Sequence, residues 1–385
     1  MKILIIHRSF ALVGGAERVI IEKANYLANQ GHEVLLVSYE QGQHPIPYVL
    51  QSNVKFVDLN CRFFTLAKYP LLIRLYKFFD LKRKLCSLLQ QTILDFSPNV
   101  VVLASDWQFL VGIVVKASKG IPVIAEFHNA YDFIIKKIGD VENGIKSKLT
   151  GFYYKRSLMQ FKNCACLVSL TENDARHWRN HSAHVVVIPN PVTLYPESVN
   201  DIPKENGRIL CVGRLNDQKR IDRLVTAFSM IADKYPAWHV DIFGEGDKRP
   251  ALQKQICECN LQERIVLHQP TKQIYDEYKK SQFLVLSSAY EGRPLVLIEA
   301  MACGLPCVAF NCPSGPSEIV EDGVSGLLAR EGDVVDLSSK IEWMITHETE
   351  RNEMAKKSRE AALAYLPSTI MEKWESLYMS VLNNS

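Results

Sequence analysis

Short apolar runs alternate with longer polar or amphipathic stretches along the chain. Runs of this length, rich in Val, Ile and Leu and bounded by polar loops, predict buried strands. The stretches between them suit helices, so the order of elements indicates two successive α/β halves with parallel sheets. The runs that predict strands are Met1–Ile6, Val34–Ser38, Val100–Leu103, Val123–Phe127, Cys164–Leu170 and Val185–Ile188, and then Ile209–Val212, Trp238–Phe243, Ile265–Leu267, Phe283–Leu286, Pro306–Phe310 and Gly326–Leu328.

The stretch 283–304 predicts a strand, a loop and a short helix. The helix is apolar on all sides except for Glu299, which is typical of a buried helix. Pro294 suits the first helical position, where its missing N–H is not needed. Gly304 is expected to end the helix in the left-handed conformation.

Glu291 lies just before this helix, and Glu299 lies within it. A buried carboxylate needs hydrogen-bond partners, and sugar hydroxyls are suitable ones. The free backbone N–H groups and the dipole at the helix start favour an anion such as phosphate. The alternative is that Glu299 pairs with an Arg or Lys while Glu291 is solvated.

A chain of 385 residues is too long for one ordinary hydrophobic core, so two domains are expected. Pro189-Asn190-Pro191 and the polar stretch after it predict the linker. This division gives domains 1–190 and 191–366. The remaining segment, 367–385, predicts a helix apolar enough to pack back on the first domain.

The composition is that of a globular protein, with 47% apolar and 23% charged residues. No apolar run is long enough to span a membrane or to act as a secretion signal, so a cytoplasmic location is expected. The ten cysteines show no Cys-x-x-Cys spacing, which favours reduced, mostly buried thiols.

Positive charge is concentrated in the first half of the chain, in two segments that also contain aromatic residues. Segment 61–84 has seven basic residues and one acid, Asp80, and segment 146–162 has no acid. Such segments are typical of contact with an anionic membrane surface. The alternative is two helices packed on a sheet with their lysines extended into solvent. Nucleic acid is not expected as a partner, because no nucleic-acid-binding motif accompanies the charge.

Gly14 and Gly15 follow the first strand and open a helix that continues through Glu17. A glycine-rich turn at a helix start lets an anion or a sugar approach the backbone. The spacing Gly-x-Gly-x-x-Gly is absent, and no acidic residue clearly ends the second strand, so a nicotinamide cofactor is disfavoured. An ordinary tight turn is the alternative.

Three polar side chains follow predicted strands, at the edge of a parallel sheet where ligands bind. His128 follows Val123–Phe127, and Arg214 and Lys219 lie in the loop after Ile209–Val212. An arginine and a lysine at this edge can neutralise a diphosphate, the arginine through bidentate contacts. The alternatives are a structural histidine and ordinary surface charge.

The chain resembles the GT-B fold retaining glycosyltransferases of family 4, also called glycosyltransferase group 1, in four motifs that occur in the family's order. The motifs are Gly14-Gly15-Ala16-Glu17, His128 after a strand, Gly213-Arg214-Leu215 with Lys219, and Glu291-Gly292 with Leu295 and Glu299-Ala300-Met301-Ala302. The resemblance implies an α/β fold of two facing Rossmann-like domains with a cleft between them that binds a nucleotide sugar. It also implies a last helix that returns to the first domain.

The resemblance implies a role for each matching residue. Arg214 and Lys219 would hold the diphosphate, Glu299 would bind the ribose, and His128 would hydrogen-bond the donor sugar near the reacting centre. Glu17 and Asp132 are expected at the acceptor. Further donor contacts would come from Gly14, Gly15, Glu291, Gly292, Arg293, Pro294 and Leu295. The family needs no bound metal and the chain has no Asp-x-Asp motif, so neither a metal nor a cofactor is expected.

Two positions depart from the family pattern. Arg220 stands where glycine usually follows the lysine, and Arg293-Pro294 replaces a common Phe-Gly or Phe-Pro. Arg293 is therefore a candidate contact for the donor sugar or for an anionic acceptor.

The expected reaction is the retaining transfer of a sugar from a nucleoside-diphosphate sugar, with UDP as the commonest nucleotide of the family, to a glycan hydroxyl. The basic segments favour a lipid-linked acceptor and a peripheral position on the inner face of the plasma membrane, in polysaccharide, lipopolysaccharide or other glycan assembly. A nucleotide-sugar epimerase or hydrolase on the same fold is one alternative. A non-catalytic nucleotide-sugar binding module is another, disfavoured because the four residues Arg214, Lys219, Glu291 and Glu299 are all present.

Overall fold

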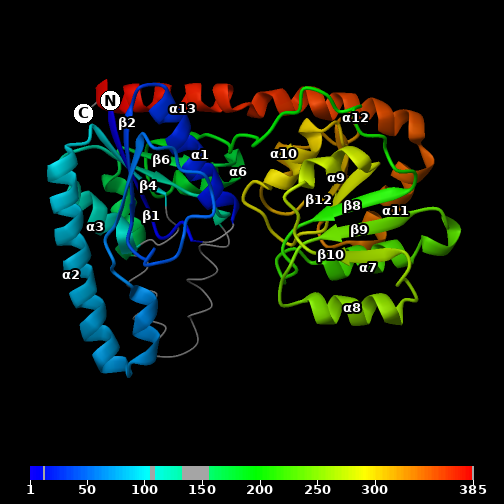
Figure 1. Ribbon diagram of the computed structural model, residues 1–385, viewed down its shortest axis with the longest axis horizontal. Helices are drawn as coiled ribbons and strands as arrows, with labels where there is room; N and C mark the ends of the chain where they lie inside the picture. Colours follow the sequence, from blue (N-terminus) through cyan, green and yellow to red (C-terminus); the bar gives the residue numbers. More distant parts are fainter. Residues whose placement is uncertain (12–13, 105–108, 132–155, 384–385) are drawn as a thin grey trace. The chain divides into compact units, whose positions relative to one another are not determined.

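The computed structural model describes residues 1–11, 14–104, 109–131 and 156–383. The chain divides into two compact units, Met1–Pro189 with Ile370–Ser385, and Asn190–Thr369. Each unit has one parallel sheet with helices on both faces (Figure 1). Two predictions, Asp132 at the acceptor and the part of the second basic segment at 146–155, lie outside the described residues.

The first unit contains a seven-stranded parallel sheet in the order β3-β2-β1-β4-β5-β6-β7. Its central strands β1 and β4 have no exposed residue, which explains their continuous apolar sequence. The apolar runs do not reveal β3, because this edge strand is half-exposed and carries Lys55 between apolar residues. The strands are β1 (Lys2–His7), β2 (Glu33–Ser38), β3 (Val54–Asp58), β4 (Val100–Ala104), β5 (Val123–Glu126), β6 (Cys166–Ser169) and β7 (Val185–Val187).

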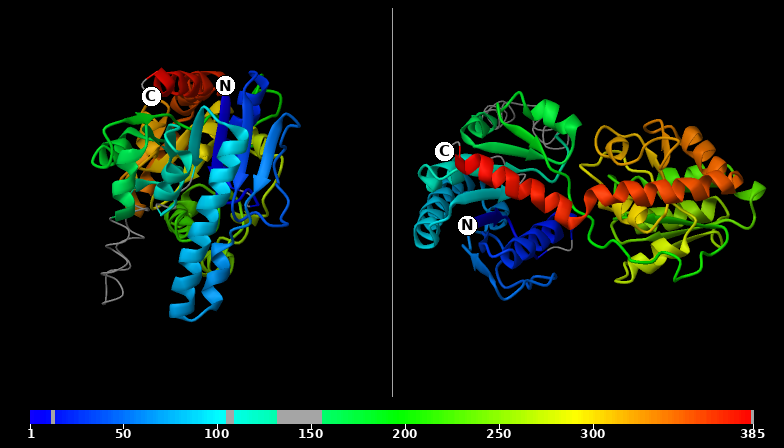
Figure 2. Two further views of the ribbon diagram at one scale, coloured as in Figure 1. Left: turned by 90° about the vertical axis from the view of Figure 1, so that its left-hand side faces the viewer. Right: turned by 90° about the horizontal axis from the view of Figure 1, so that it is seen from above.

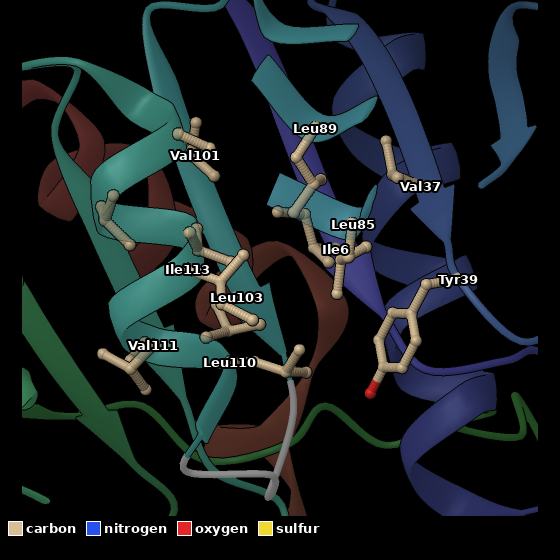
Figure 3. Packing of buried hydrophobic residues seen from close by; sticks show 14 of the residues in the cluster. Ile6, Val37, Tyr39, Leu85, Leu89, Val101, Leu103, Leu110, Val111 and Ile113 are labelled. Atoms are coloured by element: carbon tan, nitrogen blue, oxygen red, sulfur yellow. The ribbon is translucent and has the colours of Figure 1, made fainter. Parts of the chain in front are cut away.

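Helices cover both faces of this sheet. On one face, α2 (Leu71–Phe96), α3 (Phe109–Ser118) and α6 (Glu172–Trp178) share a core with the strands. Leu85, Leu103 and Leu110 lie together in this core (Figure 3). On the other face, α1 (Gly15–Asn29) and α13 (Pro367–Asn383) bury Ile20 and Trp374 in a second core. Two 3₁₀ segments, η1 (Phe63–Lys68) and η2 (Met159–Asn163), precede α2 and β6.

Helix α2 extends beyond the sheet that it covers. Its buried residues all lie in its second half: Leu85, Leu89, Ile93 and Phe96. Its first half and η1 project past the ends of the strands (Figure 2). Although α2 has 26 residues, neither it nor any other helix in the described part of the chain is both long and apolar enough to cross a membrane.

The second unit contains a six-stranded parallel sheet in the order β10-β9-β8-β11-β12-β13. Helices α7, α8 and α11 cover one face, and α9 and α10 cover the other, with α12 packed against α10. The strands are β8 (Arg208–Val212), β9 (His239–Phe243), β10 (Ile265–His268), β11 (Phe283–Leu286), β12 (Cys307–Phe310) and β13 (Gly326–Ala329). The helices are α7 (Ile221–Ser229), α8 (Arg249–Glu258), α9 (Ile274–Lys280), α10 (Leu295–Ala302), α11 (Val334–Thr346) and α12 (Glu348–Ala362), with 3₁₀ turns η3 (Ala232–Lys234), η4 (Pro316–Glu318) and η5 (Leu363–Tyr365).

Helix α10 is buried, as its apolar sequence predicts, and its residues from Leu297 onward are all inaccessible or nearly so. It begins at Leu295 and not at Pro294, because Pro294 has a ψ of 107° and is still extended. The prediction of a first helical proline is therefore wrong by one position. Gly304 has a φ of 63°, as expected of a residue that ends a helix in the left-handed conformation.

The ten cysteines are all free, and seven of them are buried. Burial raises the pKa of Cys211 to about 12, so this thiol stays protonated at neutral pH. The prediction of reduced and mostly buried thiols is confirmed.

Candidate functional site

The loop after β8 is shaped by close packing against the turn after β9. A Cβ atom at Gly244 would lie 1.9 Å from the carbonyl oxygen of Gly213, and one at Gly246 would lie 2.2 Å from that of Leu215. Only glycine allows two backbones to approach this closely. The packing fixes the loop at the carboxyl edge of the sheet, with Arg214 exposed to solvent.

Lys219 and Glu291 are brought together from the loops after β8 and β11. Lys219 Nζ lies 2.6 Å from Glu291 Oε1, and the two side chains are only 16% and 7% exposed. The Ser287 hydroxyl donates a hydrogen bond to the Lys219 carbonyl oxygen at 3.0 Å, which joins the two loops. The alternative of a merely solvated Glu291 is therefore wrong. The site combines a cation with a carboxylate.

The start of α10 lies directly after Glu291. The first backbone N–H groups of a helix have no intrahelical partner, so the turn at Leu295 offers donors to a ligand. The loop at Gly292 packs closely on Gly315, where an added Cβ would lie 2.8 Å from the Gly292 carbonyl oxygen and where φ is 95°. This contact holds the loop before α10 in place, beside the Lys219–Glu291 pair.

Arg293 is turned away from solvent and held by protein partners. Its Nη2 donates to the Tyr365 hydroxyl at 2.6 Å and to the Glu318 carbonyl oxygen at 3.0 Å. Its side chain is 6% exposed. These contacts give Arg293 a structural role, since it ties the loop before α10 to η4 and η5. They do not support the expectation that its guanidinium contacts the donor or an acceptor.

Glu299 is buried in α10 and held by two hydroxyl groups. Tyr278 donates to Oε2 at 3.1 Å and Thr193 donates to Oε1 at 3.4 Å. Burial, together with the nearby Glu299 carboxylate, raises the pKa of Tyr278 well above its usual value, so the phenol remains a donor. These partners are the kind that the sequence led us to expect for this carboxylate, because they are hydroxyls and not cations.

Arg220 has the left-handed conformation that explains why glycine is usual at this position. It is the residue before α7, with a φ of 44° and a ψ of 45°. Residues other than glycine adopt this conformation at a cost of about 1 kcal/mol. Its Nη2 lies 2.7 Å from Asp222 Oδ2, so an ion pair accompanies the strained backbone.

His128 lies just beyond the carboxyl end of β5, and its side chain is 5% exposed. Its Nε2 is 3.3 Å from Oε1 of Glu126, the last residue of that strand. Neither ring nitrogen has a hydrogen-bond partner among the described residues, so Glu126 acts on Nε2 through its charge. A carboxylate on one ring nitrogen favours the tautomer with the proton there, which leaves Nδ1 as an acceptor for a ligand hydroxyl.

Glu126 is also paired with Lys23 of α1, and both side chains are inaccessible or nearly so. Lys23 Nζ lies 3.7 Å from the ring centre of Trp374 on α13. Burial by itself raises the pKa of Glu126, but the Lys23 ammonium and His128 outweigh it and hold the pKa at about 2. Burial also lowers the pKa of Lys23. The carboxylate beside His128 is therefore ionised at neutral pH.

Gly14 and Gly15 lie at the start of α1, as the turn sequence predicts. Gly14 has an extended φ of −142° and Gly15 is exposed. Glu17, in the first turn, has its Oε1 3.8 Å from Nε2 of His7. The backbone at Gly14 is therefore not left-handed and does not require glycine. Because Gly14 and Gly15 have no side chains, the start of α1 stays accessible.

Sequence reasoning missed Lys23 and Glu126 as members of this group. Lys23 lies one turn from Val19 and one turn from Leu27 on the apolar face of α1, where a charge is unexpected. Glu126 is likewise the single charge of an otherwise apolar strand. The sequence did contain a signal for this ion pair. One charged residue lies at an apolar position of a helix, and a residue of opposite charge lies in an apolar strand of the same domain.

Segment 61–84 forms η1 and the first half of α2, and it leaves many apolar side chains in solvent. The exposed ones are Phe64, Leu71, Leu72, Ile73, Leu75, Tyr76 and Phe79. The alternative of a helix packed on a sheet with only its lysines in solvent therefore fits the second half of α2 and not the first. Of the second basic segment, the structure describes residues 156–162, where Arg156 and Lys162 are exposed.

No group of three His, Cys, Asp or Glu side chains that could hold a metal ion occurs among the described residues. In the second unit, Lys219 and Arg214 are the two cations of the loop after β8.

Two parallel α/β units with polar loops at the carboxyl edges of their sheets define a protein of GT-B fold. The structure of Anabaena Alr3699/HepE in complex with UDP and glucose matches 99% of this chain and 100% of its own, with a TM-score of 0.75 and 19% sequence identity. This likeness confirms the predicted fold class.

The chain belongs to the group 1, family 4 glycosyltransferases. Residues 13–194 match the model of Glycosyltransferase Family 4, and residues 197–361 match that of Glycosyl transferases group 1. Between them the two models cover most of both units. The resemblance seen in the four sequence motifs is thus confirmed, and the protein is a glycosyltransferase.

Relatives match over nearly the whole chain. An uncharacterized glycosyltransferase of Haemophilus influenzae is 28% identical over 94% of this chain and 96% of its own. The GalNAc-α-(1→4)-GalNAc-α-(1→3)-diNAcBac-PP-undecaprenol α-1,4-N-acetyl-D-galactosaminyltransferase of Campylobacter jejuni is 24% identical over 96% of both chains.

Proposed function

We propose that this glycosyltransferase moves a sugar, with retention of configuration, from a UDP-sugar to a hydroxyl of a lipid-linked glycan. The observation that carries the proposal is the Lys219–Glu291 pair beside the start of α10, with Arg214 in the same loop as the lysine. Cations suit the two phosphates of the donor, and a carboxylate suits the hydroxyls of its sugar. One cluster of loops in the second unit thus matches both parts of a nucleotide sugar.

The cations of these loops would stabilise the diphosphate as it leaves the donor sugar. As the bond between the anomeric carbon and the diphosphate oxygen breaks, negative charge builds on the diphosphate. Lys219, Arg214 and the N–H groups at the start of α10 would stabilise that charge, and fixed groups do so without reorganising. The acceptor hydroxyl would add to the same face of the sugar and pass its proton to the departing diphosphate. This route retains configuration without a protein nucleophile.

Two further side chains would orient the donor. Glu299 would accept hydrogen bonds from the ribose hydroxyls, in a geometry already fixed by Tyr278. His128 would accept one from the donor sugar at its Nδ1, because the Glu126 carboxylate lies at 3.3 Å on the side of its other nitrogen. Both proposals rest on buried polar groups held on one side by protein partners.

Names of related proteins support UDP and a lipid-linked acceptor. The Anabaena protein was solved with UDP and glucose, and a mutant of Staphylococcus aureus TarM with UDP and alpha-GlcNAc-glycerol. The name of the Campylobacter jejuni relative contains an undecaprenol linked through a diphosphate. Other relatives are named for lipopolysaccharide and amylovoran synthesis, which supports a role in polysaccharide assembly.

The exposed first half of α2 supports a peripheral position on the inner face of the plasma membrane. Leu72 and Tyr76 are 81% and 73% exposed, in a segment rich in lysine and arginine. Apolar side chains that enter the interface and basic ones that meet anionic lipids are the two parts of such binding.

The proposal is tested by thermal unfolding of the purified protein with UDP-, GDP- and ADP-sugars. A ligand at 100 times its Kd adds about 2.7 kcal/mol of stability, so UDP-sugars should raise the Tm selectively. Product analysis without acceptor then separates the alternatives, because an epimerase or hydrolase would convert the donor alone. Transfer to membranes should survive EDTA, since Lys219 and Arg214 supply the positive charge. Binding without any transfer to membranes, or no binding at all, would overturn the proposal.

A further inference from the structure

A basic pocket lies in the first unit, and its lining contains none of the site residues described above. It has a volume of about 340 Å³ and is lined by parts of α2, α3 and the segment 156–160. Four of its described lining residues are basic, Lys82, Arg83, Lys116 and Arg156, and none is acidic. Positive charge that converges from three segments on one concavity is suited to a phosphate group, which arginine binds in bidentate fashion and lysine as a point charge.

Gly112 leaves one wall of this pocket without a side chain. It lies within α3, where a Cβ would come to 3.3 Å from Cγ of Gln160 across the pocket. Glycine within a helix is less stable than alanine, so its presence indicates a packing or ligand requirement. Here the missing side chain lets Gln160 pack closely against α3 at the wall of the pocket.

An apolar surface of α2 leads to the pocket. Leu72, Tyr76 and Phe79 follow one another at intervals of about one helical turn and are all exposed. Phe79 also lines the pocket, and Lys82 and Arg83 come one turn further along. At a rise of 1.5 Å per residue, Leu72 and Arg83 are separated by about 16 Å along the helix. Exposed apolar side chains on one side of a basic pocket match an amphiphile with a phosphorylated head.

We propose that this pocket binds the diphosphate of the lipid-linked acceptor, with the lipid lying along the exposed apolar side of α2. This inference rests on the proposed function, because it names the acceptor class of the same enzyme. The lipid and its diphosphate remain bound to the first unit while the sugar end of the acceptor is free to reach the donor. The pocket therefore selects acceptors by their linkage to lipid, independently of the sugar that they carry.

The test measures binding of the full chain to three probes. The first is vesicles of phosphatidylcholine with a few mole per cent of undecaprenyl diphosphate. The second is phosphatidylcholine vesicles that contain phosphatidylglycerol in place of undecaprenyl diphosphate, in an amount that gives the same total charge. The third is inorganic diphosphate in solution. The pocket variant is Lys116→Gln/Arg156→Gln. The control Lys119→Gln/Lys162→Gln removes the same charge close by in the chain from positions outside the pocket lining.

The pocket variant should bind the diphosphate vesicles at least tenfold more weakly than the control does. Both variants should bind the phosphatidylglycerol vesicles equally, and inorganic diphosphate should bind far more weakly than the diphosphate vesicles. Equal losses for both variants on the diphosphate vesicles would overturn the inference in favour of a general basic surface. Inorganic diphosphate that binds as tightly as the lipid would overturn it in favour of a free anion site.

Gly112→Leu provides a test that leaves the charge unchanged. A leucine would meet Gln160 and displace it from the pocket wall, so binding of the diphosphate vesicles should fall at least tenfold, with phosphatidylglycerol binding unchanged. Thermal unfolding with UDP-sugar should be measured on every variant. If the pocket variants still respond to the nucleotide sugar and still bind the lipid diphosphate, the pocket inference fails while the proposed function stands. If the parent protein has no nucleotide-sugar response, the proposed function itself fails.

Discussion

Lys23 and Glu126 form an ion pair that is buried against Trp374, and the same carboxylate contacts His128. Removal of one partner leaves an unpaired charge inside the first unit. We expect Lys23→Met and Glu126→Leu each to lower the free energy of unfolding by about 3–5 kcal/mol. The double variant should recover most of that loss, because an apolar pair needs no compensation. Urea unfolding of the parent, the two single variants and the double variant measures these free energies. A loss in the double variant equal to the sum of the two single losses would contradict the prediction.

The same pair makes stability depend on acidic pH. The pKa of Glu126 falls from 4.5 to about 2 on folding, so the unfolded chain takes up the proton first as the pH decreases. Its contribution, on the order of 3 kcal/mol, is complete above pH 4.5 and is lost between pH 4.5 and 2.

The variant Lys23→Met should reverse this dependence. Its unpaired carboxylate is destabilising when ionised, and protonation relieves it. The loss of stability relative to the parent should therefore shrink as the pH falls from 7 toward 4. Urea midpoints at several pH values measure this, with Lys234→Met, which removes an exposed lysine, as the control. A loss that stays constant with pH would show that Glu126 is not left ionised.

Lys219 and Glu291 should both be needed for turnover. Lys219→Ala removes a cation from the leaving diphosphate, and Glu291→Ala removes the carboxylate that holds this lysine at 2.6 Å. Each should lower kcat by at least about 10²-fold, the usual effect of deleting one preorganised group. Initial rates on membranes with a saturating donor measure this, and Lys234→Ala serves as a surface control. Near-normal turnover of both folded variants would refute these roles.

The glycines of the second unit should differ sharply in their tolerance of alanine. Gly246→Ala places a Cβ 2.2 Å from a backbone oxygen that cannot move independently of the loop after β8. The nearest neighbours of a Cβ at Gly213 are atoms of the flexible Lys219 side chain, at 3.3–3.4 Å. We therefore expect Gly246→Ala to lower the Tm by several degrees through a loss of about 2 kcal/mol or more. Gly213→Ala should leave the Tm nearly unchanged and weaken donor binding by displacing Lys219. Similar Tm values for the two variants would contradict this.

Local patterns in the sequence were sufficient for the parts of the site that lie within one strand, loop and helix. Glu291, Glu299 and the buried α10 follow from a single apolar stretch with two charges and two helix-end signals. The loop with Lys219 was likewise visible as polar residues after an apolar strand. These features depend on neighbours in the chain, and short-range order is what hydrophobic periodicity encodes.

Partners distant in sequence were not predictable in this way. Lys23 and Glu126 are 103 residues apart, and Arg293 meets Tyr365 across 72 residues. An isolated charge in an apolar segment indicates that the charge has a partner, but it does not show which residue that partner is. The same limit led to Arg293 being named as a ligand contact, since an arginine that faces a ligand and an arginine buried against protein partners look alike in the sequence. The half-exposed strand β3 was missed because its edge position dilutes the apolar pattern.

The projecting half of α2 should be dispensable for catalysis in solution and needed at the membrane. Leu72 and Tyr76 are exposed in the protein alone, and each apolar side chain that enters the lipid interface should add about 1 kcal/mol or more of binding. We expect Leu72→Ser/Tyr76→Ser to weaken binding to vesicles of anionic lipid by about tenfold or more. The control Met230→Ser/Val335→Ser changes two exposed apolar residues of the second unit and should have no effect. Transfer to a water-soluble acceptor should stay unchanged in both. Equal vesicle binding by the two variants would show that charge alone holds the protein at the membrane.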